Sequence, residues 1–256
     1  QWGGGRGLDP EYLPPVQNTI LNQLAPDLYE ANAPASILGM EMGHRMVVVR
    51  LQPESGGGLW IHSPIAWTEA LEAELDALDP DGGPRHLVIP SRTHDLHLGP
   101  WLERIPAETT YAPAALQKAH PEWSIGQTLA DQYVAPWSGE ILHQGLRGAP
   151  RVSEVDFLHL PSKTLVLTDC VFNLTAPRPF LAGLLLRMNA CKLGICTTRI
   201  FRMTIKDQRA FGASIASMLG WDFERAVVGH GDVIEGAGVA ELREHLGTFL
   251  EGFEVG

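Results

Sequence analysis

The sequence predicts an α/β fold. Strand-like apolar runs alternate with helix-like amphipathic runs along the chain, which is typical of sheets covered by helices. The chain has 256 residues, of which 45% are hydrophobic and 19% are charged, and this is enough to build a sizeable core. No repeat or long low-complexity linker divides it. We therefore expect one large domain, preceded by a frayed, glycine-rich start, "QWGGGRG".

Charge and hydropathy exclude several classes of protein. The net charge is −11 and no run of Lys and Arg stands out, so we expect no nucleic-acid partner. The longest apolar stretch, residues 178–188, is too short to span a bilayer, which predicts a soluble protein. Three cysteines are too few for a disulfide framework, so a reducing, cytoplasmic setting is expected. A bond between Cys191 and Cys196 is possible, but their spacing does not establish it.

The first half of the chain predicts a hairpin and then alternating helices and strands. The turn "PESGGG" separates two apolar strands, and Thr68 is placed to cap the amphipathic helix that follows them. The expected elements are strands at 45–52 and 58–64, a helix at 68–78, strands at 85–90 and 109–113, and a short helix at 114–120.

The second half predicts two half-buried strands, a strongly apolar strand and a helix-rich end. The tight turn "PSK" joins the second and third of these strands. The expected elements are strands at 140–146, 153–160 and 164–169, a mostly helical stretch at 178–220, a strand at 225–232 and a closing amphipathic helix at 238–253.

Three apolar strands run into potential metal ligands. The strand at 85–90 leads to His94 and His97, the strand at 164–168 to Asp169, and the strand at 225–229 to His230. Sites in α/β folds form beyond the carboxyl ends of strands, and imidazole nitrogen and carboxylate oxygen suit zinc or iron. His230 lies between two glycines, which can present its ring from a tight turn. His62 also follows an apolar run and is expected at the same rim.

Ordinary alternatives stay open for each of these residues. The two histidines of the 91–101 loop also fit a polar turn, and Asp169 also fits a cap or an arginine pair. Cys170 fits a buried structural thiol better than a nucleophile. We expect no special role for the remaining histidines, which are His44, His86, His120, His143, His159 and His245.

Several stretches together resemble the metallo-β-lactamase-fold superfamily, and more closely a bacterial and plant group within it that is known as a domain of unknown function. They are "LGMEMGHRMVVVRL", "LWIHSP", "HLVIPSRTHDLHLG", "EVDFLHLPSKTLVLTD" and "AVVGHGD". The resemblance implies a four-layer αβ/βα sandwich. It also implies a flexible segment at 1–23 and a single domain at 24–256.

The superfamily's signature loop, His-x-His-x-Asp-His, falls on residues 92–97. His94 and His97 match it, whereas Arg92 replaces the first histidine and Leu96 replaces the aspartate. The bridging aspartate matches Asp169 and the final histidine matches His230; the remaining family histidine is missing, with Glu154 as its only replacement.

The resemblance therefore implies at most one divalent metal, on His97, Asp169 and His230, with zinc favoured over iron. His94 is expected beside it as an acid/base or a weak extra ligand. Arg92 is expected to replace a lost cation's charge by pairing with Asp169, or to hold an anionic substrate group, unless it points into solvent.

Three functions follow from these residues. The first is a metal-dependent hydrolase of a small ester, thioester, lactone or phosphoester. The second is a non-haem iron oxidoreductase on the same ligands. The third is a degenerate, non-enzymatic member that binds a small molecule or a partner at an empty metal site.

Residues 174–206 are expected to form a helical cap over the strand ends. They combine an apolar face with six cations, Arg178, Arg187, Lys192, Arg199, Arg202 and Lys206. This pattern predicts a pocket for an apolar substrate that carries an anionic group. An interface or a core helix is the alternative, and the oligomeric state is left open.

Overall fold

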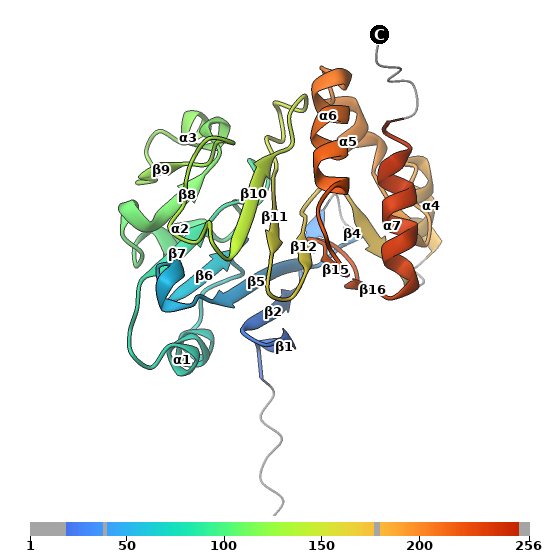
Figure 1. The fold of residues 1–256 in the computed structure, drawn as a ribbon. Coiled ribbons are helices and arrows are strands. Elements are labelled where there is room, and N and C mark those ends of the chain that lie inside the picture. Colours follow the sequence, from blue (N-terminus) through green and yellow to red (C-terminus); the bar gives the residue numbers. More distant parts are fainter. Residues whose placement is uncertain (1–18, 38–39, 177–179, 251–256) are drawn as a thin grey trace, which may run out of the picture.

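Two sheets lie back to back, with helices on both outer faces (Figure 1). The computed structural model describes residues 19–37, 40–176 and 180–250. The first sheet comes from the first half of the chain and the second sheet from the second half. The predicted four-layer α/β arrangement is thus confirmed.

The first sheet has seven strands in the order β1-β2-β5-β6-β7-β8-β9. Their bounds are β1 Asn22–Ala25, β2 Leu28–Ala33, β5 His44–Arg50, β6 Leu59–His62, β7 Arg85–Val88, β8 Thr110–Ala112 and β9 Gln127–Thr128. Neighbours from β1 to β6 are antiparallel, including the predicted β5–β6 hairpin. From β6 to β9 the strands run parallel.

The second sheet has five strands in the order β10-β11-β12-β15-β16. Their bounds are β10 Ile141–Gly145, β11 Val155–His159, β12 Thr164–Val166, β15 Arg225–Val227 and β16 Ile234–Glu235. Strands β12 and β15 are parallel and the other pairs are antiparallel. The carboxyl ends of β12 and β15 therefore meet at one edge.

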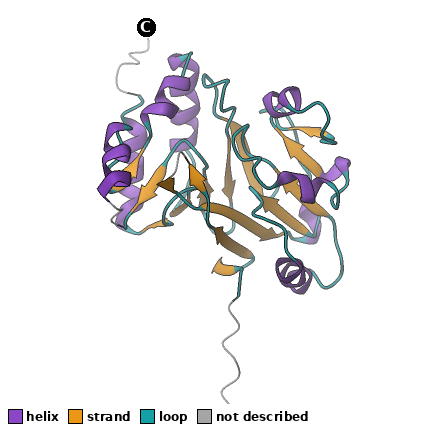
Figure 2. Cartoon of the chain, turned by 180° about the vertical axis from the view of Figure 1, so that it is seen from behind, coloured by secondary structure: helices purple, strands orange, loops and turns teal. Residues whose placement is uncertain are grey.

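The helices lie on the outer sides, as the view from behind shows (Figure 2). Their bounds are α1 Glu69–Leu78, α2 Leu98–Leu102, α3 Ala114–Ala119, α4 Phe180–Met188, α5 Arg199–Thr204, α6 Gln208–Leu219 and α7 Ala237–Gly247, with 3₁₀ turns at Pro53–Ser55 and Ala107–Thr109. Thr68 caps α1 as predicted, because its side chain accepts a hydrogen bond from the Leu71 amide.

Alternation along the strands divides the core into layers. In β5, Val47 and Val49 face the layer between the sheets, where Trp60 and Phe157 also lie. Met46 and Val48 point the other way, toward α1 and α2. On the far side, the second sheet packs against α6 and α7. Each sheet is therefore buried on both faces, which fixes where its strand ends emerge.

The cap differs in part from the mostly helical stretch predicted at 178–220. Helices α4 and α5 are present, but the chain between them returns as a strand, β14 (Gly194–Cys196). It pairs antiparallel with β13 (Phe172–Leu174), while β3 (Ser36–Ile37) and β4 (Met40–Glu41) form another small hairpin. Strand β14 has only three residues, which is too short for an alternating pattern to predict a strand. Among the predicted cations of the cap, Arg178 lies outside the described residues.

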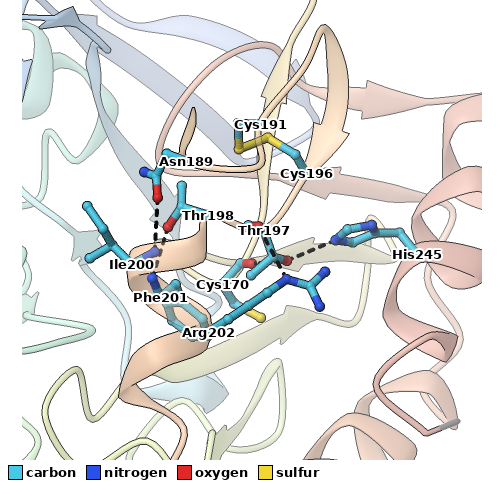
Figure 3. The surroundings of a disulfide bond; sticks show 10 residues. All are labelled: Cys170, Asn189, Cys191, Cys196, Thr197, Thr198, Ile200, Phe201, Arg202 and His245. Atoms are coloured by element: carbon cyan, nitrogen blue, oxygen red, sulfur yellow. Dashed lines mark hydrogen bonds between the residues drawn. A yellow bond between two sulfur atoms is a disulfide. The ribbon is translucent and has the colours of Figure 1, made fainter. Parts of the chain in front are cut away.

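A disulfide joins Cys191 to Cys196 across the turn into β14 (Figure 3). Both half-cystines are buried, and they pack with Met42, Phe172 and Leu186. Stable disulfides are typical of oxidising compartments. The bond therefore argues against the reducing setting that the small number of cysteines predicted. The cytoplasmic location stays a prediction.

The start of the described chain is attached to α1. The backbone amides of Ile20 and Leu21 donate to the Glu74 carboxylate, and β1 begins one residue later. Of the segment predicted to be flexible, residues 1–18 lie outside the described residues. None of the helices in the described part of the chain has the length and apolar content needed to cross a bilayer.

We expect reduction of the Cys191–Cys196 bond to lower the free energy of unfolding by about 2 kcal/mol, because it frees a short loop in the unfolded chain. Urea unfolding with and without dithiothreitol measures the difference. The double variant Cys191→Ser/Cys196→Ser is the control, and its stability should not respond to dithiothreitol. Equal stability of oxidised and reduced protein would contradict the prediction.

Candidate metal site

Three side chains from distant parts of the chain converge at one end of the two sheets. Metal-binding atoms of His94, Asp169 and His230 all lie within 4.8 Å of one another. Asp169 Oδ1 is 3.5 Å from His94 Nε2 and 3.4 Å from His230 Nε2. Two ligands of one tetrahedral ion, each about 2.0–2.1 Å from it, stand about 3.3 Å apart. The two distances from the carboxylate to the imidazoles, and the donor set of two imidazoles and one carboxylate, therefore fit zinc or iron.

The sheet topology explains the convergence. Asp169 follows β12 and His230 follows β15, and these parallel neighbours end at the same edge. His94 lies in the loop after β7, which belongs to the other sheet. The site thus bridges the two sheets, and both histidines are buried while the Asp169 side chain keeps 18% exposure.

The orientation of His230 is fixed by the backbone. Its Nδ1 lies 2.7 Å from the carbonyl oxygen of Gly43. A carbonyl only accepts, so Nδ1 carries the hydrogen and a neutral ring has a bare lone pair on Nε2. That lone pair faces Asp169 Oδ1, which is also an acceptor. Two acceptors at this distance require a cation between them, either a proton on the ring or a metal ion.

The loop that carries His230 has little freedom. Gly231 has φ 92°, and a Cβ there would lie 1.9 Å from the Asn173 carbonyl oxygen. The buried Arg45 guanidinium donates to the carbonyls of Val228 (2.7 Å) and Gly231 (2.6 Å). The predicted need for glycine beside His230 is thus met at Gly231.

His94 is oriented by Ser63, which follows β6. Ser63 Oγ lies 2.7 Å from His94 Nδ1 and 3.2 Å from His44 Nε2. When His94 Nδ1 donates to Ser63, the Nε2 lone pair is free toward Asp169, as a metal ligand requires. Ser63 is fully buried and has φ 53°, a left-handed conformation that is costly for a non-glycine residue.

Glu154 holds the Asp169 loop through hydrogen bonds to its backbone. The Glu154 carboxylate accepts from the amides of Thr168 (2.7 Å), Asp169 (3.1 Å) and Cys170 (2.9 Å). Thr93 donates its hydroxyl to Asp169 Oδ2, which leaves Oδ1 toward the histidines. Glu154, predicted as a replacement ligand, thus supports a ligand-bearing loop through the backbone.

Charge is concentrated around the Asp169 carboxylate. Burial disfavours its charge, but His94 and His230 outweigh this and lower the pKa of Asp169 well below its usual range. Burial likewise opposes the charged form of His94, yet the charge of Asp169 raises the pKa of His94. Burial and then the Asp169 charge raise the pKa of Glu154 to about 7. A proton on His94 and a metal ion therefore compete for the same carboxylate.

His97 and Arg92 lie outside this group. The His97 ring is 5.7 Å from the His44 ring, and its Nε2 is buried with no hydrogen-bond partner among the described residues. The Arg92 side chain is exposed, and none of the described ion pairs joins it to Asp169. The structure therefore brings His94, and not His97, together with Asp169 and His230.

Two further histidines differ in placement from expectation. His44, expected to have no special role, is buried beside the site, and burial followed by the charge of His94 lowers its pKa to about 3. His62, expected at the rim, is buried and stacks on Trp60 beside Phe157. The partner that brings His44 into the site is Ser63, which no local pattern indicates.

A cavity of about 450 Å³ opens beside the three ligands. Its wall is mostly apolar, and Arg151 is the one Lys or Arg among the described residues that line it. The lining includes His44, Thr93, His94, Leu96, Arg151, Asp169, Phe172, Leu186, Ile200, Phe201 and His230. Helices α4 and α5 contribute to it, as expected of a cap, but the described cap cations Arg187, Lys192, Arg199, Arg202 and Lys206 are exposed elsewhere.

Known proteins match this chain at two levels. The model of a family described as a domain of unknown function, DUF4336, matches residues 27–221. No curated protein matches the chain.

Solved structures show the fold. The DIM-1 metallo-β-lactamase is 15% identical with a TM-score of 0.59, covering 89% of this chain and 96% of that one. A metallo-β-lactamase from Pontibacter korlensis is 15% identical with a TM-score of 0.56, covering 88% and 97%. A putative diflavin flavoprotein fragment from Nostoc sp. PCC 7120 is 9% identical with a TM-score of 0.61, covering 91% and 96%. The chain therefore has the metallo-β-lactamase fold.

We expect Glu154→Gln to weaken metal binding about 10- to 100-fold, because the amide cannot accept from three backbone N–H groups and the Asp169 loop shifts. Competition with a chromogenic chelator measures the affinity. Glu140→Gln is the matched control, since Glu140 is also buried and accepts from a backbone amide, that of Gln52, away from the site. Equal affinities in both variants would refute a role for Glu154.

Proposed function

The chain belongs to the DUF4336 family, and we propose that it is a metal-dependent hydrolase with a single metal ion on His94, Asp169 and His230. One observation carries the proposal: Nε2 of His230 lies 3.4 Å from the Asp169 carboxylate, beside a cavity of substrate size. A cation is needed between these atoms, and the adjoining cavity has room for a substrate on which the ion can act.

The ion, when bound, would lower the pKa of a water molecule and polarise the bond to be hydrolysed. Three protein ligands leave a position open for that water, as in catalytic zinc sites. We favour zinc over iron, although the same donor set also suits a non-haem iron oxidoreductase. His94 acts in this proposal as a ligand.

The protein's own residues orient the metal ligands and select the substrate. Ser63 and the Gly43 carbonyl fix the two imidazoles, and Thr93 fixes the carboxylate. The apolar wall of the cavity excludes water and binds the apolar part of a substrate. Arg151 takes the place that Arg92 was expected to have, and binds an anionic substrate group at the cavity wall. An ester, thioester, lactone or phosphoester with a carboxylate or phosphate group fits this arrangement.

We expect purified protein to hold one zinc or iron ion per chain and to lose it in His94→Ala and His230→Ala, because each removes one of three ligands. His97→Ala, in the same loop as His94, is the matched control and should keep the ion. Elemental analysis gives the stoichiometry and the identity of the metal. A chelator should lower the melting temperature of wild type. A metal-free protein that ignores chelators, or loss of the ion in His97→Ala alone, would refute this site.

We expect the loaded protein to hydrolyse the carboxylate-bearing member of a matched pair of esters faster than its neutral counterpart. Arg151→Ala should lower kcat/KM for the charged ester about tenfold and leave the neutral ester unchanged, because one charge-assisted contact is lost. Arg92→Ala is the control, since its exposed side chain is absent from the cavity wall. No hydrolysis of esters, thioesters, lactones or phosphoesters by metal-loaded protein would contradict the proposed activity.

A further inference from the structure

The cap carries a charge opposite to that of the rest of the chain. Residues 174–206 contain six Lys and Arg and no Asp or Glu, in a protein whose net charge is −11. The described cations Arg187, Lys192, Arg199 and Lys206 are exposed. Arg202 is also exposed, although its guanidinium lies 4.5 Å from the centre of the Phe249 ring. The cap is therefore a positive face on an acidic body.

The same segment concentrates exposed apolar side chains. Of the nine large hydrophobic residues exposed in the described part of the chain, six belong to the cap. They are Leu184, Leu185, Met188, Leu193, Ile200 and Met203. Met188 is 63% exposed and Met203 is 67% exposed, so these side chains are far from being packed. Exposed apolar groups gathered in one segment indicate a contact surface.

Local contacts join these residues into one face. Asn189, which follows α4, accepts a hydrogen bond from the Arg199 amide through its backbone carbonyl. Its side-chain oxygen accepts a hydrogen bond from the Ile200 amide (Figure 3). The disulfide closes the turn between the two helices. Leu186 and Phe201 point inward and are buried, which directs the neighbouring side chains of α4 and α5 outward. We call this surface the cap face, defined by the six apolar residues and the cations Arg187, Lys192, Arg199 and Lys206.

We propose that the cap face docks on the surface of a bilayer that contains anionic lipids. Cations bind the headgroups while Leu, Ile and Met side chains enter the boundary with the acyl chains. The acidic body then faces away from the negative surface. A symmetric contact with a second copy would instead place cation against cation, which disfavours a dimer through this face.

The cavity opening belongs to this surface. Ile200 lines the cavity and is 54% exposed, and Leu96, 65% exposed, lines it from the opposite loop. Docking therefore turns the cavity toward the membrane. The docking does not depend on the proposed hydrolase activity, because no metal ligand takes part in it.

Sedimentation with vesicles tests the proposal. We expect the protein to bind vesicles of equal parts phosphatidylcholine and phosphatidylglycerol at about 50 mM salt, and to be released at about 500 mM salt, where charges are screened. Vesicles of phosphatidylcholine alone should bind it at least tenfold more weakly. Arg187→Glu/Arg199→Glu should weaken binding more than about twentyfold, from about fivefold for each cation lost. Met188→Ser/Met203→Ser should weaken it as well.

Matched controls come from exposed residues outside the cap. Lys118→Glu repeats the charge reversal on α3, and Val134→Ser repeats the loss of an exposed apolar side chain. Both should bind vesicles like wild type, and metal content should be unchanged in every variant. The proposal is overturned if wild type does not bind anionic vesicles at low salt, or if the controls lose binding equally. A dimer in light scattering that Met188→Ser/Met203→Ser dissociates would assign the face to a second copy instead.

Discussion

The approach of His230 Nε2 to Asp169 Oδ1, which needs a proton or a metal ion between the two atoms, is the constraint around which this end of the molecule is organised. The contact exists because Nδ1 of His230 donates to the Gly43 carbonyl, which turns Nε2 toward Asp169. Arg45 holds the His230 loop and Glu154 holds the Asp169 loop, each through hydrogen bonds to the loop backbone. Ser63 imposes the same geometry on His94. Rigid loops that hold three ligand atoms around one point are what a metal site needs before the metal arrives.

The sequence was sufficient where local pattern decides the outcome. Strands β5 and β6, helix α1 and its Thr68 cap follow from alternation, helical spacing and turn residues. Asp169 and His230 could be placed at one edge because both follow short apolar strands, which the structure shows to be parallel neighbours. Pattern therefore predicts which loops meet at this edge.

The choice between His94 and His97 was beyond the sequence. The two histidines lie three residues apart in one loop, and only His94 is held by Ser63, which is 31 residues away from it along the chain. The place of His44 beside the site could not be predicted for the same reason, since its contact with Ser63 crosses from β5 to the end of β6. Arg151 lines the cavity from the loop between β10 and β11 of the second sheet, whereas the exposed Arg92 does not line it. Residues that orient ligands or substrate are set by tertiary contacts, and spacing in sequence does not encode them.

The cap connects the chemistry of the cavity to the surface of the molecule. Its inward residues Leu186 and Phe201 make the cavity wall, and its outward residues make a face that is both apolar and positive. An aqueous environment explains why the inward residues are buried. It does not explain why the outward Met and Leu side chains are exposed, because apolar side chains are unfavourable in contact with water. The proposed docking at a membrane accounts for both sets of residues, since an amphipathic molecule with an anionic group partitions into the boundary between headgroups and acyl chains. Such a molecule would meet the apolar wall and Arg151 in the same orientation in which it lies in a lipid layer.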